Sequence, residues 1–272
     1  MGSIGPETLP GDGEGPVRDV HVSSFLIDST CVTKRQFSTF VEETAYVTDA
    51  QTFGWSYVFA RALPSGAVTR GSVAGTPWWL GVDGAYWACP EGPGSTWEER
   101  MDHPAVHISW RDAQAYAVWA GLRLPTESEW EKAARGELVG ALYPWGDELY
   151  PEGQTRANIW QGDFPSKSIA LDGYVGTVPV NSYSPNAVGL YNMAGNVWEW
   201  THDRWSAGWH APARLETRID PQGPASGADR VIRGGSYLCH HSYCTRYRVS
   251  ARSHNSPDST TAHMGFRCAK SL

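Results

Sequence analysis

The 272-residue sequence lacks a long hydrophobic run, and no stretch approaches the ~20 consecutive apolar residues that a membrane-spanning helix needs. Its first residues, Met1 to Gly5, also lack the basic and apolar regions of a secretory signal peptide. These absences argue against the transmembrane and secreted classes. We therefore expect a soluble cytoplasmic protein that does not act at a membrane.

The sequence has little positive charge. It contains 22 Lys and Arg against 29 Asp and Glu, which gives a formal net charge of −7, and no run of Lys or Arg exceeds two residues. Proteins that bind phosphate backbones or anionic lipids usually present a basic patch. The composition therefore argues against nucleic acid and anionic membranes as partners.

Cysteine is also scarce, and the five cysteines are too sparse for a disulfide-stabilised secreted module. In contrast, the chain contains 29 Gly, 18 Pro and 14 Trp residues. Gly and Pro favour turns and loops, and aromatic side chains can supply the core that long helices otherwise provide. We therefore expect a globular, loop-rich protein with an aromatic core.

Three short helices are expected in the first half of the chain. They begin at Thr33, Ser109 and Thr126, each followed three residues later by Gln, Asp or Glu in the spacing of a capping box. The second and third are expected to stop at Gly121 and Gly136. A strand is expected within residues 20–27, and after about residue 140 the pattern indicates only short strands between turns. With no repeat or charged linker, residues 1–272 are predicted to form a single α+β domain with little regular secondary structure.

The most informative segment contains the closely spaced pair Cys239 and Cys244. Two thiols five positions apart can converge in a loop as a disulfide or a two-sulfur metal site, or remain an inert pair. Structural zinc usually needs four ligands, whereas monovalent copper accepts fewer and prefers thiolates. His240 and His241 are possible further ligands, although a loop histidine is more often a surface or hydrogen-bonding residue.

This segment belongs to a series of motifs that resembles the formylglycine-generating enzymes, the sulfatase-modifying factors. The resemblance covers nearly the whole chain. Most of the motifs also occur in relatives with other activities, so they indicate the fold, whereas the Cys-x4-Cys spacing indicates the catalytic subgroup. The matching segments are Arg123 to Glu131, Pro144 to Gly146, Asn158 to Gly162, Gly189 to Trp200, Gly234 to Tyr237, Cys239 to Cys244, Arg246 to Arg248, Ala251 to Ser253, Pro257 to Asp258 and Gly265 to Cys268.

The resemblance implies a C-type-lectin-like fold and a copper-dependent oxidase. Such an enzyme converts the cysteine of a Cys-x-Pro-x-Arg motif in an unfolded sulfatase polypeptide to Cα-formylglycine, using O₂ and a thiol reductant. Cys239 and Cys244 would bind Cu(I), and residues matching the surrounding active site are Ser236, Trp198, His240 and Arg252. From the residues alone, Trp198 is as readily a core residue, and Arg252 can simply anchor loops through bidentate hydrogen bonds.

The resemblance also implies structural calcium, which binds about six to eight oxygen atoms. One site would use the side chains of Asn158 and Asp172 with the carbonyl groups of Ile159 and Tyr174. A second site would use Asn192, Gly195, Val197 and Glu199. Without the resemblance, Asp172-Gly173 is an ordinary turn.

Two features depart from the family pattern. The positions of the disulfides of eukaryotic members hold Ala117, Ala134 and Val249 here, which leaves Cys268 without its partner and suits a reducing compartment. His263 stands near the expected pocket, where the family usually has Asn. That exchange affects the handling of substrate or oxygen if the residue reaches the pocket.

The tryptophans Trp78, Trp79 and Trp87 lie in a stretch that we expect to be irregular. They are candidates for a peptide-binding groove, although large aromatic side chains are more often packed in a core. The sequence alone does not decide between these two roles.

Two other functions stay open. Iron-dependent sulfoxide synthases share this domain, but they add a helical bundle with a three-histidine iron site that residues 1–110 do not offer. A non-catalytic lectin-like binding module is the second alternative, and it has no use for Cys239 and Cys244.

Overall fold

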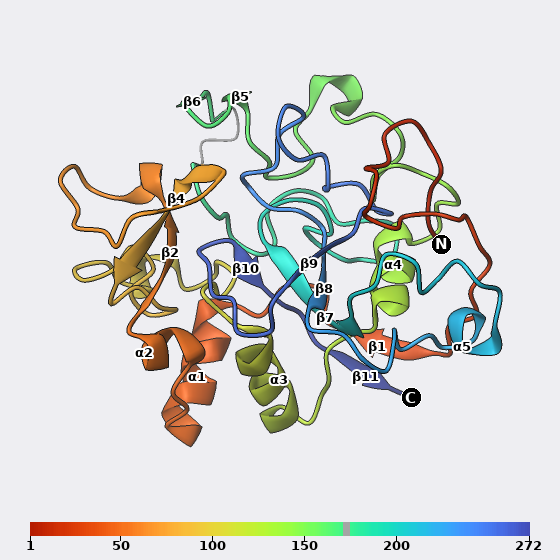
Figure 1. The fold of residues 1–272 in the computed structure, drawn as a ribbon, viewed down its shortest axis with the longest axis horizontal. Coiled ribbons are helices and arrows are strands. Elements are labelled where there is room, and N and C mark those ends of the chain that lie inside the picture. Colours follow the sequence, from red (N-terminus) through yellow and green to blue (C-terminus); the bar gives the residue numbers. More distant parts are fainter. Residues whose placement is uncertain (171–174) are drawn as a thin grey trace.

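The computed structural model describes residues 1–170 and 175–272, in which short helices and strands are joined by long loops (Figure 1). None of the helices in these ranges is long and apolar enough to cross a membrane. The predicted mixture of helix and sheet in a loop-rich chain is confirmed. The helices are α1 (Lys34–Thr44), α2 (Asp49–Phe53), α3 (Trp110–Trp119), α4 (Glu127–Arg135) and α5 (Leu215–Arg218), with 3₁₀ turns at Ala60–Ala62, Glu98–Arg100 and Pro151–Gly153. The strands are β1 (Phe25–Ile27), β2 (Trp55–Phe59), β3 (Ser72–Val73), β4 (Thr76–Asp83), β5 (Gly162–Asp163), β6 (Lys167–Ser168), β7 (Trp198–Arg204), β8 (Arg230–Arg233), β9 (Ser253–Asn255), β10 (Met264–Gly265) and β11 (Ala269–Ser271).

The three predicted helices begin at their capping residues. The side chains of Thr33, Ser109 and Thr126 accept hydrogen bonds from the backbone N–H three residues later, at 3.1, 3.1 and 3.2 Å. The side chain at that later position accepts in return from the N–H of the cap. α4 ends directly before Gly136, as expected, whereas α3 already ends at Trp119, two residues before Gly121.

The helix α2 was not expected from the sequence pattern. Thr48 and Gln51 form the same capping box there, and Gly54, at a φ of 74°, ends the helix after five residues. So short a helix contains too few apolar residues for a helical period to be recognised.

A four-stranded sheet lies at the centre of the molecule, with the strand order β10-β7-β8-β9 (Figure 1). β7 and β8 are antiparallel, with Glu199 opposite Arg233, whereas β10 runs parallel to β7. β1 pairs with β11, so segments from the two ends of the chain lie side by side. A separate sheet of order β2-β4-β3 lies to one side, in orange in Figure 1.

Two strands differ from the sequence-based expectation. Trp78 and Trp79 belong to the eight-residue strand β4, so the expectation of an irregular stretch there is wrong. The seven-residue strand β7 is longer than the short strands expected after residue 140. Most of its side chains are buried, including Glu199 and Asp203, so polar and apolar residues do not alternate along it as they do in a half-buried strand.

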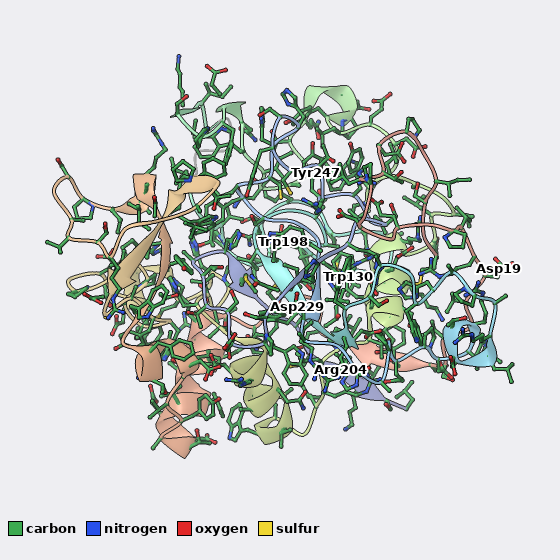
Figure 2. All side chains as sticks on the ribbon, viewed as in Figure 1. Asp19, Trp130, Trp198, Arg204, Asp229 and Tyr247 are labelled. Atoms are coloured by element: carbon green, nitrogen blue, oxygen red, sulfur yellow. The ribbon has the colours of Figure 1, made fainter. Side chains whose placement is uncertain are left out.

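Aromatic side chains form much of the core, as expected. Phe37 stacks on Tyr116 with ring centroids 5.9 Å apart, and Phe266 meets Tyr116 edge-on at 5.3 Å. The buried indole of Trp130 donates to Glu199 at 2.7 Å, which satisfies its polar atom. In the view of Figure 2, Trp198 lies near the middle of the molecule and Asp19 at its edge.

A cluster of buried charges surrounds Glu127, the first residue of α4. Its carboxylate accepts hydrogen bonds from Arg233 at 2.9 Å and from two nitrogens of Arg252 at 2.5 and 2.9 Å. His210 Nε2 lies 3.2 Å from the same carboxylate. None of these four side chains is more than 3% exposed. The cluster therefore joins α4 to β8 and to the start of β9 inside the protein.

The charge state of the cluster follows from its geometry. Burial raises the pKa of Glu127, but the charge of Arg252, the hydrogen bond with His210 and the charge of Arg233 together hold it well below the usual range. Burial, followed by the charge of Glu127, raises the pKa of Asp203 to about 8. At neutral pH Glu127 is therefore ionised, and Asp203, which accepts from the Glu127 N–H at 2.7 Å, largely keeps its proton.

Replacing Glu127 by Gln is expected to reduce the free energy of unfolding by about 3–5 kcal/mol, because Arg233 and Arg252 would stay buried without their shared counter-charge. The contribution of Glu127 is complete above its ordinary pKa of 4.5 and is lost as the pH falls through its lower pKa in the folded state. Urea unfolding at pH 7 measures the loss. Glu216→Gln is the control, because the Arg214–Glu216 pair is about 60% exposed and should contribute little. Equal effects of the two substitutions would contradict the assignment.

Candidate active site

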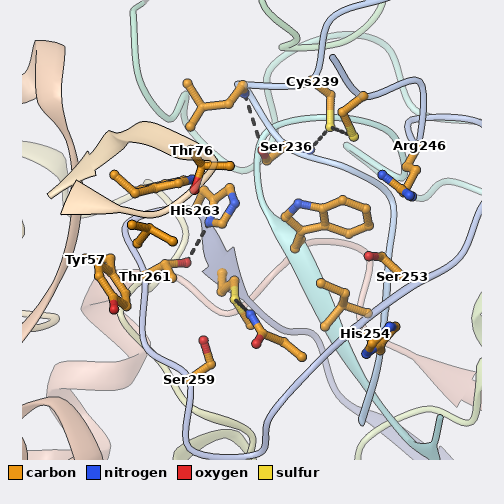
Figure 3. Close-up of a pocket in the computed structure, with 18 of the residues that line it drawn as sticks. Tyr57, Thr76, Ser236, Cys239, Arg246, Ser253, His254, Ser259, Thr261 and His263 are labelled. Carbon is orange, nitrogen blue, oxygen red and sulfur yellow. Dashed lines mark hydrogen bonds between the residues drawn. The ribbon is translucent and has the colours of Figure 1, made fainter. Parts of the chain in front are cut away.

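A cavity of about 370 Å³ lies between the β2-β4-β3 sheet and the loops that follow β8 and β9 (Figure 3). Trp79 and Tyr57 line it from the small sheet, and Trp198, at the start of β7, lines it from the central sheet. Of the residues predicted from the sequence to form the active site, the cavity brings together Cys239, Cys244, Ser236 and Trp198.

Two glycines direct the chain from β8 into the cavity wall. Gly234 and Gly235 have φ angles of 89° and 72°, a region that disfavours other residues. A Cβ atom on Gly235 would also lie only 3.1 Å from the backbone of Tyr247. The following turn is closed by the N–H of Cys239, which donates to the Ser236 carbonyl at 2.9 Å. The tight turn therefore places the Cys239 side chain at the cavity wall.

The two cysteines converge. Cys239 Sγ and Cys244 Sγ are 2.9 Å apart, longer than the ~2.05 Å of a disulfide bond, so they are separate thiols in contact. The N–H of Ser236 donates to Cys239 Sγ at 3.4 Å, and the N–H of Cys244 donates to the His240 carbonyl at 2.7 Å. A backbone hydrogen bond therefore holds the sulfur of Cys239, and another fixes the main chain at Cys244.

The thiol pair is electrostatically uneven. A hydrogen bond from Cys239 lowers the pKa of Cys244 to about 7 despite burial, with a further contribution from Arg246. Burial and the same pairing raise the pKa of Cys239 well above its usual value. The Arg246 guanidinium is fixed by two bonds to Asp12, at 2.6 and 3.1 Å. The pair therefore loses its first proton near neutral pH, and the negative charge resides on Cys244.

Neutral and aromatic groups form the opposite wall. His263 lies across the cavity from Arg246 (Figure 3), and its Nδ1 is 2.6 Å from the Thr261 hydroxyl. Burial lowers the pKa of His263 to about 3, so its ring is neutral. The His263 carbonyl accepts from the Trp198 N–H at 2.8 Å. The expectation that His263 lies near the pocket is confirmed.

The three tryptophans considered for a peptide groove lie in different parts of the structure. Trp79 lines the cavity, whereas Trp78 packs edge-on against Tyr243 with ring centroids 4.9 Å apart. Trp87 is buried in the main core, 5.5 Å from Phe37 between ring centroids. Only Trp79 among the three is therefore placed to touch a ligand in this cavity.

Two predicted active-site residues do not line the cavity. His240 is partly exposed, and its Nδ1 lies 2.8 Å from the Ser242 hydroxyl. Arg252 is buried in the Glu127 cluster and also donates to the carbonyl of Gly13 at 3.0 Å. This placement favours the anchoring role for Arg252 over direct contact with a ligand.

The donor atoms of the thiol pair fit a soft metal ion. Two converging thiols, one of them favoured as thiolate, are the ligands that Cu(I) prefers. In residues 1–170 and 175–272, no group of three or more His, Cys, Asp or Glu side chains is placed to hold a metal ion. A site at Cys239 and Cys244 would therefore have two protein ligands, which excludes the four-ligand pattern of structural zinc.

The predicted calcium ligands fit unevenly. Asp172 and Tyr174 of the first set lie outside the described residues, and the side-chain amide of Asn158 donates through Nδ2 to the Gly176 carbonyl at 2.9 Å. In the second set, Asn192 Oδ1 is buried without a hydrogen-bond partner, as a cation ligand would be.

The carboxylate of Glu199, in contrast, is saturated. Its oxygens accept from Arg267 at 2.7 and 2.8 Å, from Trp130 at 2.7 Å and from Cys31 at 3.2 Å. Its side chain therefore does not fit a calcium site as it stands, whereas that of Asn192 does. The carbonyl-bearing residues Gly195 and Val197 lie between them in the chain.

Comparison with known proteins identifies the family. The model of the sulfatase-modifying factor enzyme 1-like domain matches residues 1–272. The chain belongs to the sulfatase-modifying factor family.

Relatives within the family include active and inactive proteins. The chain is 60% identical to a formylglycine-generating enzyme of Thermomonospora curvata over 270 residues, covering 99% of this chain and 89% of the relative. It is 55% identical to that of Streptomyces coelicolor, with 99% and 85% covered. It is also 44% identical to the inactive Cα-formylglycine-generating enzyme 2 of Bos taurus, with 99% and 84% covered. Membership of the family therefore leaves the activity to be argued from the site.

The fold also matches a solved structure. PvdO from Pseudomonas aeruginosa aligns with a TM-score of 0.66 over 100% of this chain and 90% of that chain, at 24% identity. At this identity the likeness concerns the fold alone, and it agrees with the predicted sulfatase-modifying-factor architecture.

Several cavity residues of this sulfatase-modifying factor were not assigned a role from the sequence. They include Arg246, which follows Cys244 by two positions, and Tyr243, which directly precedes it. Because they are so close to the two cysteines in the sequence, they could have been proposed as site residues from the sequence alone. The contribution of Thr261 and of the small sheet depends on long-range packing, which no local pattern indicates.

Mild oxidation is expected to join Cys239 and Cys244 in a disulfide, because their sulfur atoms already touch. Treatment with diamide, followed by peptide mapping, should show the cross-link in most chains. Cys31, which is 3% exposed and hydrogen-bonded to Glu199, is expected to stay a free thiol in the same sample. Unmodified Cys239 and Cys244 under conditions that oxidise glutathione would contradict the converging geometry.

Proposed function

We propose that the chain is a copper-dependent oxidase that converts the cysteine of a Cys-x-Pro-x-Arg motif in an unfolded sulfatase polypeptide to Cα-formylglycine. The observation that carries the proposal is the thiol pair Cys239 and Cys244, 2.9 Å apart in a cavity wall. The 60% identity to a formylglycine-generating enzyme over 99% of this chain supports it. A reducing compartment such as the cytoplasm suits the five free thiols.

The proposed reaction needs O₂ and a thiol reductant. The substrate R–CH₂–SH, one O₂ and two hydrogen atoms from the reductant give R–CHO, H₂S and H₂O. The β-carbon loses its sulfur and one hydrogen and gains a double bond to oxygen. The reductant supplies its two hydrogen atoms by forming a disulfide, so substrate and reductant together provide the four electrons that O₂ takes up.

The residues of the cavity would have different roles in this reaction. When bound, Cu(I) would supply a soft centre that holds the substrate thiolate next to O₂. Cys239 and Cys244 would ligate it, and Arg246, held by Asp12, would balance the negative charge of the thiolates. Trp198, which is 6% exposed, lines the same cavity with an apolar ring and would limit the access of bulk water to the bound substrate.

The substrate arginine is expected to bind beyond the cavity. It follows the reacting cysteine by four positions, so in an extended peptide it lies about 13 Å away. The described lining of the cavity contains no Asp or Glu to pair with it. The cavity itself is therefore suited to the cysteine and its direct neighbours, while the charge of the motif is recognised at the rim.

Replacing Cys239 or Cys244 by Ser is expected to abolish Cu(I) binding and to lower kcat/KM for a Cys-x-Pro-x-Arg peptide more than about 100-fold, because each change removes one of two soft ligands. The assay incubates copper-loaded protein with peptide, O₂ and a thiol reductant and reads the aldehyde by mass spectrometry. Cys89→Ser is the matched control, since Cys89 does not line the cavity, and should keep full activity. Aldehyde formation by both active-site variants, or none by the wild type, would refute the proposal.

We also propose that calcium stabilises the loop at Asn192, supported by the unpartnered Oδ1 atom of this residue. Glu199 would take part only if its carboxylate were shared with Arg267, since its oxygens are already occupied. The ion would be structural, because this side chain does not line the cavity of the thiol pair.

Adding calcium to chelator-treated protein is expected to raise the melting temperature by several degrees, because an ion that binds only the folded state stabilises it. Asn192→Ala should remove most of this increase. Magnesium is the control ion, since it demands a smaller octahedral site and should have a weaker effect. A melting temperature that does not respond to calcium would contradict the proposal.

A further inference from the structure

A second cavity, of about 260 Å³, lies behind the turn that carries the thiol pair. Ser236, Leu238 and Cys239 line the first cavity, whereas Tyr237, between them, lines the second. Ala262 lines the second cavity in the same way, between Thr261 and His263. The two cavities therefore share a thin wall but no described lining residue.

Lys34, the first residue of α1, lines this second cavity and is fully buried. Its backbone is held by the N–H, which donates to the His103 carbonyl at 2.9 Å. Its Nζ atom, however, has no hydrogen-bond partner in the protein. A buried ammonium group without a partner is strongly unfavourable, so it must either lose its proton or gain a counter-ion.

The surrounding charges do not provide the counter-ion. Glu91 is the one carboxylate among the described residues that line the cavity, and Arg100 already binds it through two bonds, at 2.7 and 2.5 Å. Arg61 adds a third positive charge to the lining. Since Arg100 takes both bonds to Glu91, this carboxylate compensates the charge of Lys34 only in part.

The neighbouring groups are also suited to donating hydrogen bonds. Burial raises the pKa of Tyr237 beyond its usual range, so its phenol keeps its proton. Burial, followed by the charge of Arg100, lowers the pKa of Lys34 to about 7, and a bound anion would shift it back upward. Burial and the charge of Lys34 keep His103 and His107 neutral, with pKa values of about 4 and 3.

We propose that this cavity binds a small monovalent anion, such as a halide or formate, between the Lys34 ammonium group and the Tyr237 phenol. One negative charge completes the partial compensation of Lys34, and the ion satisfies a buried donor that the protein leaves without a partner. The bound ion would fix the back of the turn from Ser236 to Cys239. The proposal does not depend on the activity of the thiol pair.

Bromide is the probe for this site. Crystals of the wild-type protein grown with sodium bromide should show an anomalous peak within hydrogen-bond distance of Lys34 Nζ. Lys34→Met, which keeps the length of the side chain but removes its charge, should lose the peak. A cavity without a peak in the wild type, or with the same peak in Lys34→Met, would overturn the proposal.

Melting temperatures give an independent measurement in solution. At constant ionic strength, replacing gluconate, which is too large for the cavity, by saturating bromide should raise the wild-type melting temperature by about 5 °C. Lys34→Met should be at least as stable as the wild type in gluconate and should not respond to bromide. Lys270→Met, an exposed lysine on β11, is the matched control and should respond like the wild type. If Lys34→Met does not fold, Lys34→Gln replaces it; an equal response of wild type and variant would refute the site.

Discussion

The carboxylate of Glu127 fixes the loop on which the site depends. Arg233, the last residue of β8, and Arg252, the residue before β9, both bind it. The chain between these two arginines carries Ser236, Cys239 and Cys244. Both ends of that loop are therefore attached to a single point on α4. An error in this attachment would move both sulfur atoms relative to Trp198, which is fixed separately in β7.

Buried charges of this kind add little net stability compared with an apolar core, because each ion must be removed from water. Their value here is geometric. Arg233 satisfies Glu127 and Glu131 at the same time, and Arg252 also reaches the Gly13 carbonyl, so each guanidinium has a preferred set of partners. A hydrophobic cluster could hold the same segments together without specifying their relative positions. The ion pairs thus provide a rigid scaffold for a segment that has almost no regular secondary structure.

This arrangement explains what could be predicted from the sequence. The capping residues Thr33, Ser109 and Thr126 act locally, so the starts of these three helices could be predicted, and the thiol pair could be recognised from its spacing. The full length of β7 could not be predicted, because Glu199 is buried in this strand and its charge is matched by Arg267 from another part of the chain. The role of Arg252 was left open for the same reason: only the fold shows that its guanidinium is engaged by Glu127 rather than turned into the cavity.

The scaffold of the site and its thiol pair depend on different residues. The glycine turn, the ion cluster and the indoles determine where the loop after β8 runs, whereas the chemistry proposed for that loop rests on its two thiols. The proposed activity would add a second requirement, because two sulfur atoms would have to meet beside a cavity while Arg246 favours the thiolate form of one of them. Asp12 holds Arg246 from the opposite end of the chain. The charge at the sulfur pair therefore depends on long-range closure of the fold, so the spacing of the cysteines is necessary for the proposed chemistry but not sufficient.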